Sequence, residues 1–326
     1  MPRLSLAGPY PKGVFEKITA LLPGDWTIRR IETQEELNAQ TDLEYVILRT
    51  FTMGKALIES NPGLRMIQRW GAGYDSVDIA AAGARGIPVA VAAGVNSHAV
   101  AEHAILLIMA SLRNLLPIAT NTTTGGWDRN TYASRTHMLA EKSVGLLGCG
   151  AIGRRVAALL KGLGANVSYS DPYRLDAETE QRLGLTYAET DALFSNSDVI
   201  SLHLPLTDST AGMVNARLLA LMKPAAILVN TARGGLIDEN ALADALGSGR
   251  LQGAALDSFS EEPYPAEGRL RNAPNLIMTP HVGGTVAELN DHMARRVCEN
   301  IGKVFEGKPL SPRELVNRDA CGYPVD

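Results

Sequence analysis

Cysteine and aromatic residues are scarce in this chain. Its 326 residues include only three cysteines, and aromatic residues make up 5%. Cys149, Cys298 and Cys321 are scattered, odd in number and without a CxxC pair. Such a pattern favours neither a disulfide framework nor a zinc site, so we expect no metal and a reducing, cytoplasmic location.

The chain also lacks an excess of positive charge. It carries 31 lysines and arginines against 35 aspartates and glutamates, which gives a net charge of -4 and a pI of about 5.9. Nucleic acids and anionic membranes attract strongly basic surfaces. We therefore expect no nucleic-acid partner and instead a small-molecule partner.

No long hydrophobic run is present. The most apolar helical stretch, Ala104 to Leu112, is about half of the roughly 20 residues that cross a bilayer, and Glu102 and Arg113 flank it. At the start, MPRLSLAGPYPKG has too short an apolar run for a signal peptide. The apolar stretch is therefore interpreted as a buried helix, and we expect no membrane partner.

Short apolar runs alternate with helical patterns from Ser143 onward. With 45% hydrophobic residues and a length of 326, the chain can form two domains of ordinary size. The expected strands are 144–147, 166–170, 198–202, 226–230, 253–257 and 276–279, with helices such as 152–163 and 239–246 between them. This alternation is typical of an α/β fold with a doubly wound parallel sheet, the Rossmann type.

A weaker alternation precedes this region. Apolar runs at 45–48 and 87–91 and a helical pattern near 14–22 predict a smaller, flavodoxin-like α/β domain. Two helices, 97–116 and 285–306, would connect the domains as hinges. We expect the large domain to comprise residues 96–289, and the smaller, discontinuous domain to comprise residues 1–95 and 290–326.

The glycines of VGLLGCGAIGRRVA have the spacing of a dinucleotide-binding turn. Gly148, Gly150 and Gly153 fit G-x-G-x-x-G, with Ala151 and Ile152 inside the motif, between an expected strand and an expected helix. In a chain with 31 glycines the spacing alone barely exceeds chance. The context is what distinguishes this motif from an ordinary glycine-rich turn between a strand and a helix.

The second strand of this unit ends in an acid. Asp171 lies 18 residues after Gly153, where a carboxylate can accept hydrogen bonds from the adenine ribose. A carboxylate there repels a 2′-phosphate, so the sequence predicts NAD rather than NADP. A solvated aspartate is the alternative. Arg174 is close enough to bind a 2′-phosphate if its loop turned inward, although a surface position is commoner for arginine.

Three residues with catalytic chemistry follow three expected strands. Arg233, Glu262 and His281 each lie just beyond a strand's carboxyl end, where parallel sheets bind ligands. Arginine can bind a carboxylate in two places, histidine can transfer a proton, and glutamate can orient that histidine. Together they predict reduction of a 2-keto acid, although each alone is commonly a loop residue or a salt-bridge partner.

The other five histidines have simpler interpretations. We expect His98 and His292 on helix surfaces, His103 in a packed helix, His137 in a loop and His203 at a strand end. None of them is expected to have a second and a third partner at strand ends. His281 is therefore the candidate acid and base.

Several stretches resemble the D-isomer-specific 2-hydroxyacid dehydrogenase family. They are GAGYDSVDIAAAGARGIPV from Gly71, NSHAVAEHAILLIMA from Asn96, VGLLGCGAIG from Val144, HLPLTDST from His203, NTARGGLIDENAL from Asn230, GAALDSFSEEP from Gly253 and TPHVGG from Thr279. The resemblance covers nearly the whole chain. It implies an NAD-dependent oxidoreductase acting on a small D-2-hydroxy acid or 2-keto acid.

The resemblance also implies roles for single residues. Arg233, Glu262 and His281 would occupy the catalytic positions, the backbone around Ala72 and Gly73 would bind the substrate carboxylate, and Asp257 would hold the nicotinamide carboxamide. Further cofactor contacts would come from His203, Pro205, Thr231, Ala232, Gly283 and Gly284. The family also implies a homodimer formed through the nucleotide domain, with the region from Asn96 to Trp127 at the interface.

The sequence leaves the substrate open. Arg49 aligns with a position that reaches a distal anionic group in some members, while a surface arginine is an equal alternative. The loop DSFSEEP departs from the commoner pattern of an aliphatic residue and an acid, and residues 128–141 show no diagnostic substrate-closing residue. The alternatives are an NAD-sensing, corepressor-like protein on the same fold and oxidation of formate or phosphite.

Overall fold

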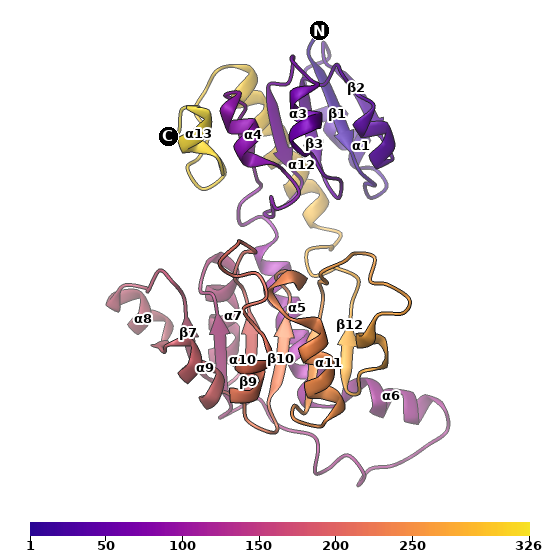
Figure 1. The fold of residues 1–326 in the computed structure, drawn as a ribbon, viewed down its shortest axis with the longest axis vertical. Helices are drawn as coiled ribbons and strands as arrows, with labels where there is room; N and C mark the ends of the chain where they lie inside the picture. Colours follow the sequence, from indigo (N-terminus) through magenta and orange to yellow (C-terminus); the bar gives the residue numbers. More distant parts are fainter. The chain divides into compact units, whose positions relative to one another are not determined.

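The computed structural model describes residues 1–326, which divide into two compact units. Unit 1 comprises Met1–Asn96 and Val286–Asp326, and unit 2 comprises Ser97–Thr285. Each unit is a parallel sheet with helices on both faces (Figure 1). The fold class predicted from the sequence is therefore confirmed.

The sheet of unit 2 has seven parallel strands in the order β12-β11-β10-β9-β6-β7-β8. The strands are β6 (Ser143–Leu147), β7 (Asn166–Ser170), β8 (Thr186–Tyr187), β9 (Val199–Leu202), β10 (Ile227–Asn230), β11 (Gly253–Leu256) and β12 (Leu276–Met278). All six expected strands are present. The sequence pattern missed β8, because two residues at a sheet edge are too short to show alternation.

Two hydrophobic cores lie on the two faces of this sheet. Neighbouring strand residues point to opposite faces, so Val229 joins the core beneath α5 and α7 while Leu228 joins the core beneath α9, α10 and α11. The helices and 3-10 turns of unit 2 are α5 (Ser97–Leu112), α6 (Leu115–Thr123), α7 (Ala151–Gly162), α8 (Ala177–Leu183), α9 (Thr190–Asn196), α10 (Ala216–Leu221), η1 (Gly234–Leu236), α11 (Glu239–Gly247) and η2 (Arg269–Asn272).

The expectation of one helix over 97–116 is wrong. Helix α5 ends at Leu112, and α6 begins at Leu115 after a bend of 65°. Asn114 interrupts the helix because its backbone takes a left-handed conformation, φ 47°, which asparagine tolerates better than most residues. Its side chain donates to the Arg135 carbonyl at 2.6 Å.

No single helix is long and apolar enough to cross a membrane, and α5 and α6 meet those criteria only as a bent pair.

The sheet of unit 1 has five parallel strands in the order β2-β1-β3-β4-β5. They are β1 (Arg3–Ala7), β2 (Thr27–Ile31), β3 (Tyr45–Leu48), β4 (Met66–Arg69) and β5 (Val89–Ala90). Its helices are α1 (Val14–Leu21), α2 (Gln34–Asn38), α3 (Lys55–Glu59), α4 (Ile79–Ala84), α12 (Leu289–Phe305) and α13 (Arg318–Cys321).

Unit 1 is completed by the last part of the chain. Helix α12 packs beside α1 and β4, and its residues Met293, Val297 and Ile301 are buried in the same core as Leu4 and Leu6 of β1. This helix begins later than the expected Thr285. The Thr285 N–H instead donates to the Val282 carbonyl in a turn, at 2.8 Å.

Candidate active site

The three predicted catalytic residues follow three neighbouring strands. Strands β10, β11 and β12 are adjacent and parallel, so their carboxyl ends lie at one edge of the sheet (Figure 1). Arg233 follows β10, Glu262 follows β11 and His281 follows β12. Parallel pairing therefore presents all three residues at this edge.

Glu262 and His281 form a direct pair. His281 Nδ1 lies 2.8 Å from Glu262 Oε2 and 3.1 Å from Oε1, and the two side chains are 47% and 39% exposed. Partial burial acts to raise the pKa of Glu262, but hydrogen bonds from His281 and the Phe259 N–H and the charges of His281 and Arg233 lower it overall. The glutamate is thus ionised near neutrality beside a histidine that solvent can reach.

Arg233 is held at the edge by the end of β10. The buried Asn230 side chain donates to the Arg233 carbonyl at 2.8 Å and accepts from the Ala232 N–H at 3.0 Å. The positive charge of Arg233 is near enough to lower the pKa of Glu262. Sequence reasoning missed Asn230, whose only signal was a polar residue at the end of an apolar strand.

Asp257, predicted to contact the cofactor, binds groups of its own domain. Its carboxylate accepts from the Thr279 hydroxyl at 2.6 Å, the Val282 N–H at 2.9 Å and the Gly283 N–H at 2.8 Å. Burial acts to raise the pKa of Asp257, and hydrogen bonds from His103, Thr279 and the two amides lower it overall. The side chain is only 3% exposed. Its contact with the nicotinamide stays a prediction.

The expectation that His103 lacks partners at strand ends is wrong. Its Nε2 lies 3.2 Å from Thr279 Oγ1 and 3.3 Å from Asp257 Oδ1. Helix α5 packs against β10 and β11, which brings this histidine to the ends of β11 and β12. The sequence could not show this, because residue 103 is far along the chain from both partners.

The glycine-rich turn has the geometry of a dinucleotide cradle. Gly148 has φ 97°, and a Cβ there would lie 2.7 Å from the His203 carbonyl carbon; a Cβ on Gly153 would lie 2.4 Å from the Gly148 oxygen. Helix α7 begins directly after Gly150. The N–H groups of Ala151, Ile152 and Gly153 therefore open a 12-residue helix, where phosphate groups bind favourably.

His203 and Asp171 surround this turn. Burial lowers the pKa of His203 to about 4, so its imidazole is neutral at physiological pH. The Asp171 carboxylate accepts from the Cys149 N–H at 2.7 Å and from the Tyr173 N–H at 2.8 Å, which places it next to the turn. Arg174 instead pairs with Glu180 at 3.0 Å and lies over the Tyr187 ring at 4.8 Å.

The remaining predicted cofactor residues lie at the same strand ends. Thr231, directly after β10, has a buried hydroxyl without a hydrogen-bond partner, and the buried Ser258 hydroxyl after β11 also has none. Such orphaned groups fit a ligand that supplies partners. Ala232, Pro205 and Gly284 lie at least partly accessible in the loops after β10, β9 and β12. These residues thus fit a bound dinucleotide.

Within unit 1, Ala72 and Gly73 follow β4. Their N–H groups donate no hydrogen bond within the chain, whereas the Gly73 carbonyl accepts from Arg69 Nε at 2.8 Å. Two unsatisfied amides beside each other suit a carboxylate. The backbone here is therefore compatible with the predicted role.

Arg49 follows β3 of unit 1. Its guanidinium donates to the Pro9 carbonyl, and burial lowers its pKa from the usual arginine value. Tyr10 beside it donates its hydroxyl to the Ile47 carbonyl at 2.8 Å and packs edge to face on Trp70 at 5.3 Å. Arg49 is thus anchored on the loop after β1 rather than extended freely into solvent.

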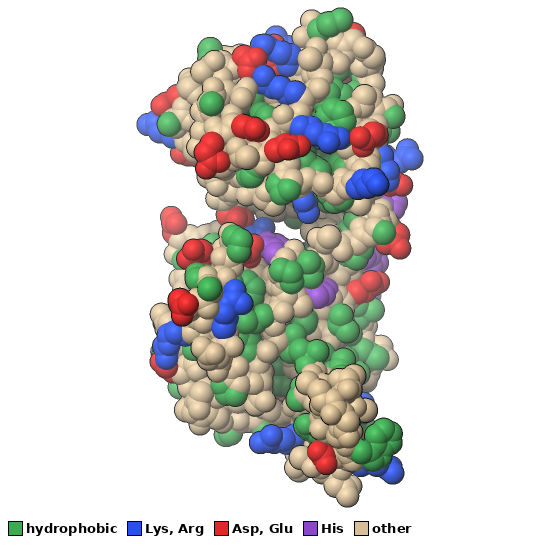
Figure 2. Space-filling model, turned by 90° about the vertical axis from the view of Figure 1, so that its right-hand side faces the viewer, with side chains coloured by type: hydrophobic (Ala, Val, Ile, Leu, Met, Phe, Trp, Pro, Cys, Tyr) green, Lys and Arg blue, Asp and Glu red, His purple; other side chains and the backbone are tan.

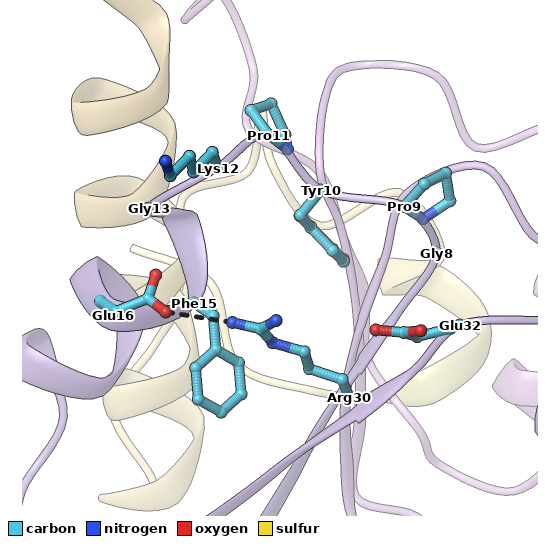
Figure 3. A pocket seen from close by; sticks show the side chains of 10 residues that line it. All are labelled: Gly8, Pro9, Tyr10, Pro11, Lys12, Gly13, Phe15, Glu16, Arg30 and Glu32. Atoms are coloured by element: carbon cyan, nitrogen blue, oxygen red, sulfur yellow. Dashed lines mark hydrogen bonds and ion pairs between the residues drawn. The ribbon is translucent and has the colours of Figure 1, made fainter.

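A separate pocket of about 600 Å³ lies within unit 1, between the loop after β1 and the end of β2 (Figure 3). Arg30 crosses it, pairs with Glu16 at 3.1 Å and lies over the Phe15 ring at 4.2 Å. Its lining residues are Gly8, Pro9, Tyr10, Pro11, Lys12, Gly13, Phe15, Glu16, Arg30 and Glu32. None of the predicted site residues lines this pocket.

No cluster of three or more histidine, cysteine or acidic side chains is arranged to hold a metal ion.

Comparison with known proteins gives matches over most of the chain. Residues 105–283 match the family model of the D-isomer specific 2-hydroxyacid dehydrogenase, NAD binding domain. The chain is 37% identical over 279 residues to a glyoxylate reductase of Thermococcus litoralis, covering 84% of this chain and 83% of that protein. It is 36% identical over 284 residues to a D-3-phosphoglycerate dehydrogenase of Synechocystis, covering 87% of this chain.

The same fold occurs in a solved NAD complex. An NAD-dependent formate dehydrogenase from Staphylococcus aureus in complex with NAD superposes with a TM-score of 0.88 at 28% identity, over 96% of this chain and 98% of that one. By contrast, the chain spans 50% of the length of the Synechocystis dehydrogenase. Of these three relatives, the glyoxylate reductase and the formate dehydrogenase match over most of their own length.

Proposed function

The chain belongs to the D-isomer-specific 2-hydroxyacid dehydrogenase family, and we propose on that basis that it transfers a hydride between NAD(H) and a small D-2-hydroxy acid or 2-keto acid. The observation that carries the proposal is the pair of His281 and Glu262 at 2.8 Å, with the charge of Arg233 beside it. Reduction of a ketone requires a proton as well as a hydride, and this pair can supply the proton.

Each residue of the trio has one task. The bound nicotinamide supplies the hydride or takes it up. Arg233 binds the substrate carboxylate, and His281 donates a proton to the carbonyl oxygen or accepts it from the hydroxyl in the reverse direction. Glu262, whose pKa is lowered, is ionised and stabilises the protonated imidazole. His281 is exposed enough to reach substrate, since 47% of its side chain is accessible.

The cofactor site favours NAD. Asp171 presents a carboxylate next to the glycine turn, and Arg174, the one residue nearby that the sequence suggested for a 2′-phosphate, is paired with Glu180. We propose that Asp171 accepts hydrogen bonds from the adenine ribose, and that Gly148, Gly150 and Gly153 allow the pyrophosphate to approach α7.

Formate oxidation is a rival function, because two of the similar solved structures are formate dehydrogenases. Formate releases carbon dioxide when it loses a hydride, so that reaction transfers no proton to or from the enzyme. The Glu262 and His281 pair would then have no acid and base role. This difference in proton demand is why we favour the keto acid.

The first test is turnover of a substrate panel with NADH. We expect one or more of glyoxylate, hydroxypyruvate, pyruvate, phosphohydroxypyruvate and 2-ketogluconate to be reduced. His281→Asn should lower kcat by about 100-fold to 10,000-fold, because the general acid is lost. Binding of NADH, measured by fluorescence titration, should stay within about twofold of the wild type.

His292→Asn is the matched control, since this histidine is exposed on α12. It should leave kcat unchanged. Tight NADH binding without turnover of any keto acid would contradict the proposal: turnover of formate alone would then establish the rival enzyme, and no turnover at all would favour the NAD-sensing, corepressor-like role.

We also propose that unit 1 is the substrate-binding domain, with Ala72, Gly73 and Arg49 as its contacts. The free N–H groups of Ala72 and Gly73 suit the carboxylate. The Arg49 guanidinium donates one hydrogen bond, to the Pro9 carbonyl, and its five N–H donors leave capacity for an anion. Keto acids with a second negative group are then the favoured substrates.

Arg49→Ala tests this preference. We expect kcat/KM to fall about 10-fold or more for phosphohydroxypyruvate and much less for pyruvate, because a charge-assisted hydrogen bond to the second anion is lost. Arg30→Ala, in the pocket of unit 1 that contains no proposed substrate residue, is the control. An equal change in kcat/KM for both keto acids would show that Arg49 does not bind the second negative group.

We further propose a homodimer formed through unit 2. Helix α6 buries none of its nine residues, and a helix of that length is marginal unless its apolar face is covered. Leu115 and Leu116 of α6 and Leu106 of α5 are exposed, and Trp127 and Met138, in the segment after α6, are 79% and 71% exposed. Figure 2 shows several hydrophobic side chains on the surface of the lower unit. A second copy of the same surface would cover them.

Leu116→Glu should shift the protein from dimer to monomer in analytical ultracentrifugation, because it places a charge inside the covered surface. Leu159→Glu, at an exposed leucine of α7, should leave the dimer intact. A wild-type protein that sediments as a monomer at micromolar concentration would contradict the proposal.

We place the enzyme in the cytoplasm. All three cysteines are free and buried, and burial raises the pKa of Cys149 to about 11 and that of Cys298 to about 12. Unpaired thiols of this kind are typical of a reducing compartment.

A further inference from the structure

A second pair of histidine and carboxylate lies behind the proposed acid and base. His103 of α5 and Asp257 after β11 are 14% and 3% exposed, whereas His281 and Glu262 are 47% and 39% exposed. His103 Nε2 lies 3.3 Å from Asp257 Oδ1 and 3.2 Å from Thr279 Oγ1. The buried pair is therefore well shielded from solvent, and it needs another task than proton transfer to substrate.

The hydrogen bonds determine which atom carries the proton. The Thr279 hydroxyl has one proton, which it donates to Asp257 Oδ1 at 2.6 Å. The Thr279 oxygen can then only accept, and the Asp257 carboxylate is ionised because its pKa is lowered. His103 Nε2 faces two acceptors and must carry a hydrogen. His103 is thus a donor to the buried carboxylate and to Thr279.

The same carboxylate fixes the turn that carries His281. Asp257 Oδ1 accepts from the Val282 N–H at 2.9 Å and Oδ2 accepts from the Gly283 N–H at 2.8 Å, the two amides directly after His281. His281 itself has φ 53°, a left-handed conformation that few residues adopt without support from their surroundings. The Asp257 carboxylate supplies that support.

Close packing shows that this arrangement has little freedom. A Cβ on Gly283 would lie 2.9 Å from Asp257 Oδ2 and 3.3 Å from His103 Cδ2. Glycine at this position lets the turn approach both side chains. A shift of His103 or Asp257 would consequently be transmitted to the turn and to the direction of the His281 ring.

We propose that His103 is a positioning residue for the reaction, which acts through Asp257 on the turn that holds His281. The inference rests on the proposed function of His281. It assigns Asp257 a structural task in addition to the predicted contact with the nicotinamide. In the exposed pair of Glu262 and His281, the histidine transfers the proton. The buried pair of Asp257 and His103 keeps His281 in its left-handed conformation.

The test compares two substitutions of His103. His103→Leu replaces the imidazole by an apolar side chain of similar size and so removes the donor. It should lower kcat about 10-fold to 100-fold, because a small misplacement of a reacting group can cost about 100-fold in rate. His103→Gln places an amide donor near the position of Nε2 and should restore kcat to within about threefold of the wild type. The dissociation constant for NADH should stay within about twofold for both variants.

A double variant separates positioning from general loss of structure. If His103 acts through His281, then His103→Leu should add less than about twofold to the loss caused by His281→Asn. His98→Leu is the matched control, because His98 is exposed on the same helix, and it should leave kcat unchanged. The thermal midpoint of each variant shows whether the fold is retained.

Three results would overturn the inference: a kcat for His103→Leu equal to the wild type, no rescue by glutamine, or a full additional loss in the double variant. These outcomes are distinct from failure of the proposed function. That failure appears as a wild-type enzyme without turnover of any keto acid, whereas the inference fails on an active wild type.

Discussion

Parallel pairing of β10, β11 and β12 is the constraint on which the candidate site depends. Because the three strands are neighbours and run in one direction, the residues after them meet at one edge of the sheet. Arg233 and His281 are 48 residues apart in the sequence, and Glu262 lies between them. A hydrogen bond of 2.8 Å joins Glu262 to His281. No local motif could bring them together.

The candidate site contains two pairs, each made of one carboxylate and one histidine. The accessible pair, Glu262 and His281, has the exposure that proton exchange with a substrate requires, and the buried pair, Asp257 and His103, has the hydrogen bonds that a fixed turn requires. The left-handed backbone of His281 connects the two, since its following amides donate to Asp257. The hydrogen bonds that Asp257 accepts thus compensate for the backbone strain at His281.

The sequence predicted the larger unit well and the smaller one in part. Strands such as β7 and β10 are continuous apolar runs between loops, so their positions could be read directly, whereas β8 has two residues and no pattern. The break at Asn114 was missed because apolar residues continue on both sides of it. His103 was read as a packed helical residue, since its partners Asp257 and Thr279 are near only in the folded chain. The residue types of the acid and base could be predicted, but the hydrogen bonds of His103 and Asp257 that support them depend on contacts made only in the folded chain.

The central claim is that hydride and proton reach a keto acid with one stereochemical outcome. The direct measurement uses NADH that carries deuterium at both positions of the nicotinamide C4, with the keto acid of the panel that the wild type reduces fastest and whose product is chiral, followed by chiral separation and mass spectrometry of the product. The account predicts a D-2-hydroxy acid with a single deuterium at C2. An L or racemic product, or a product without deuterium, would contradict it.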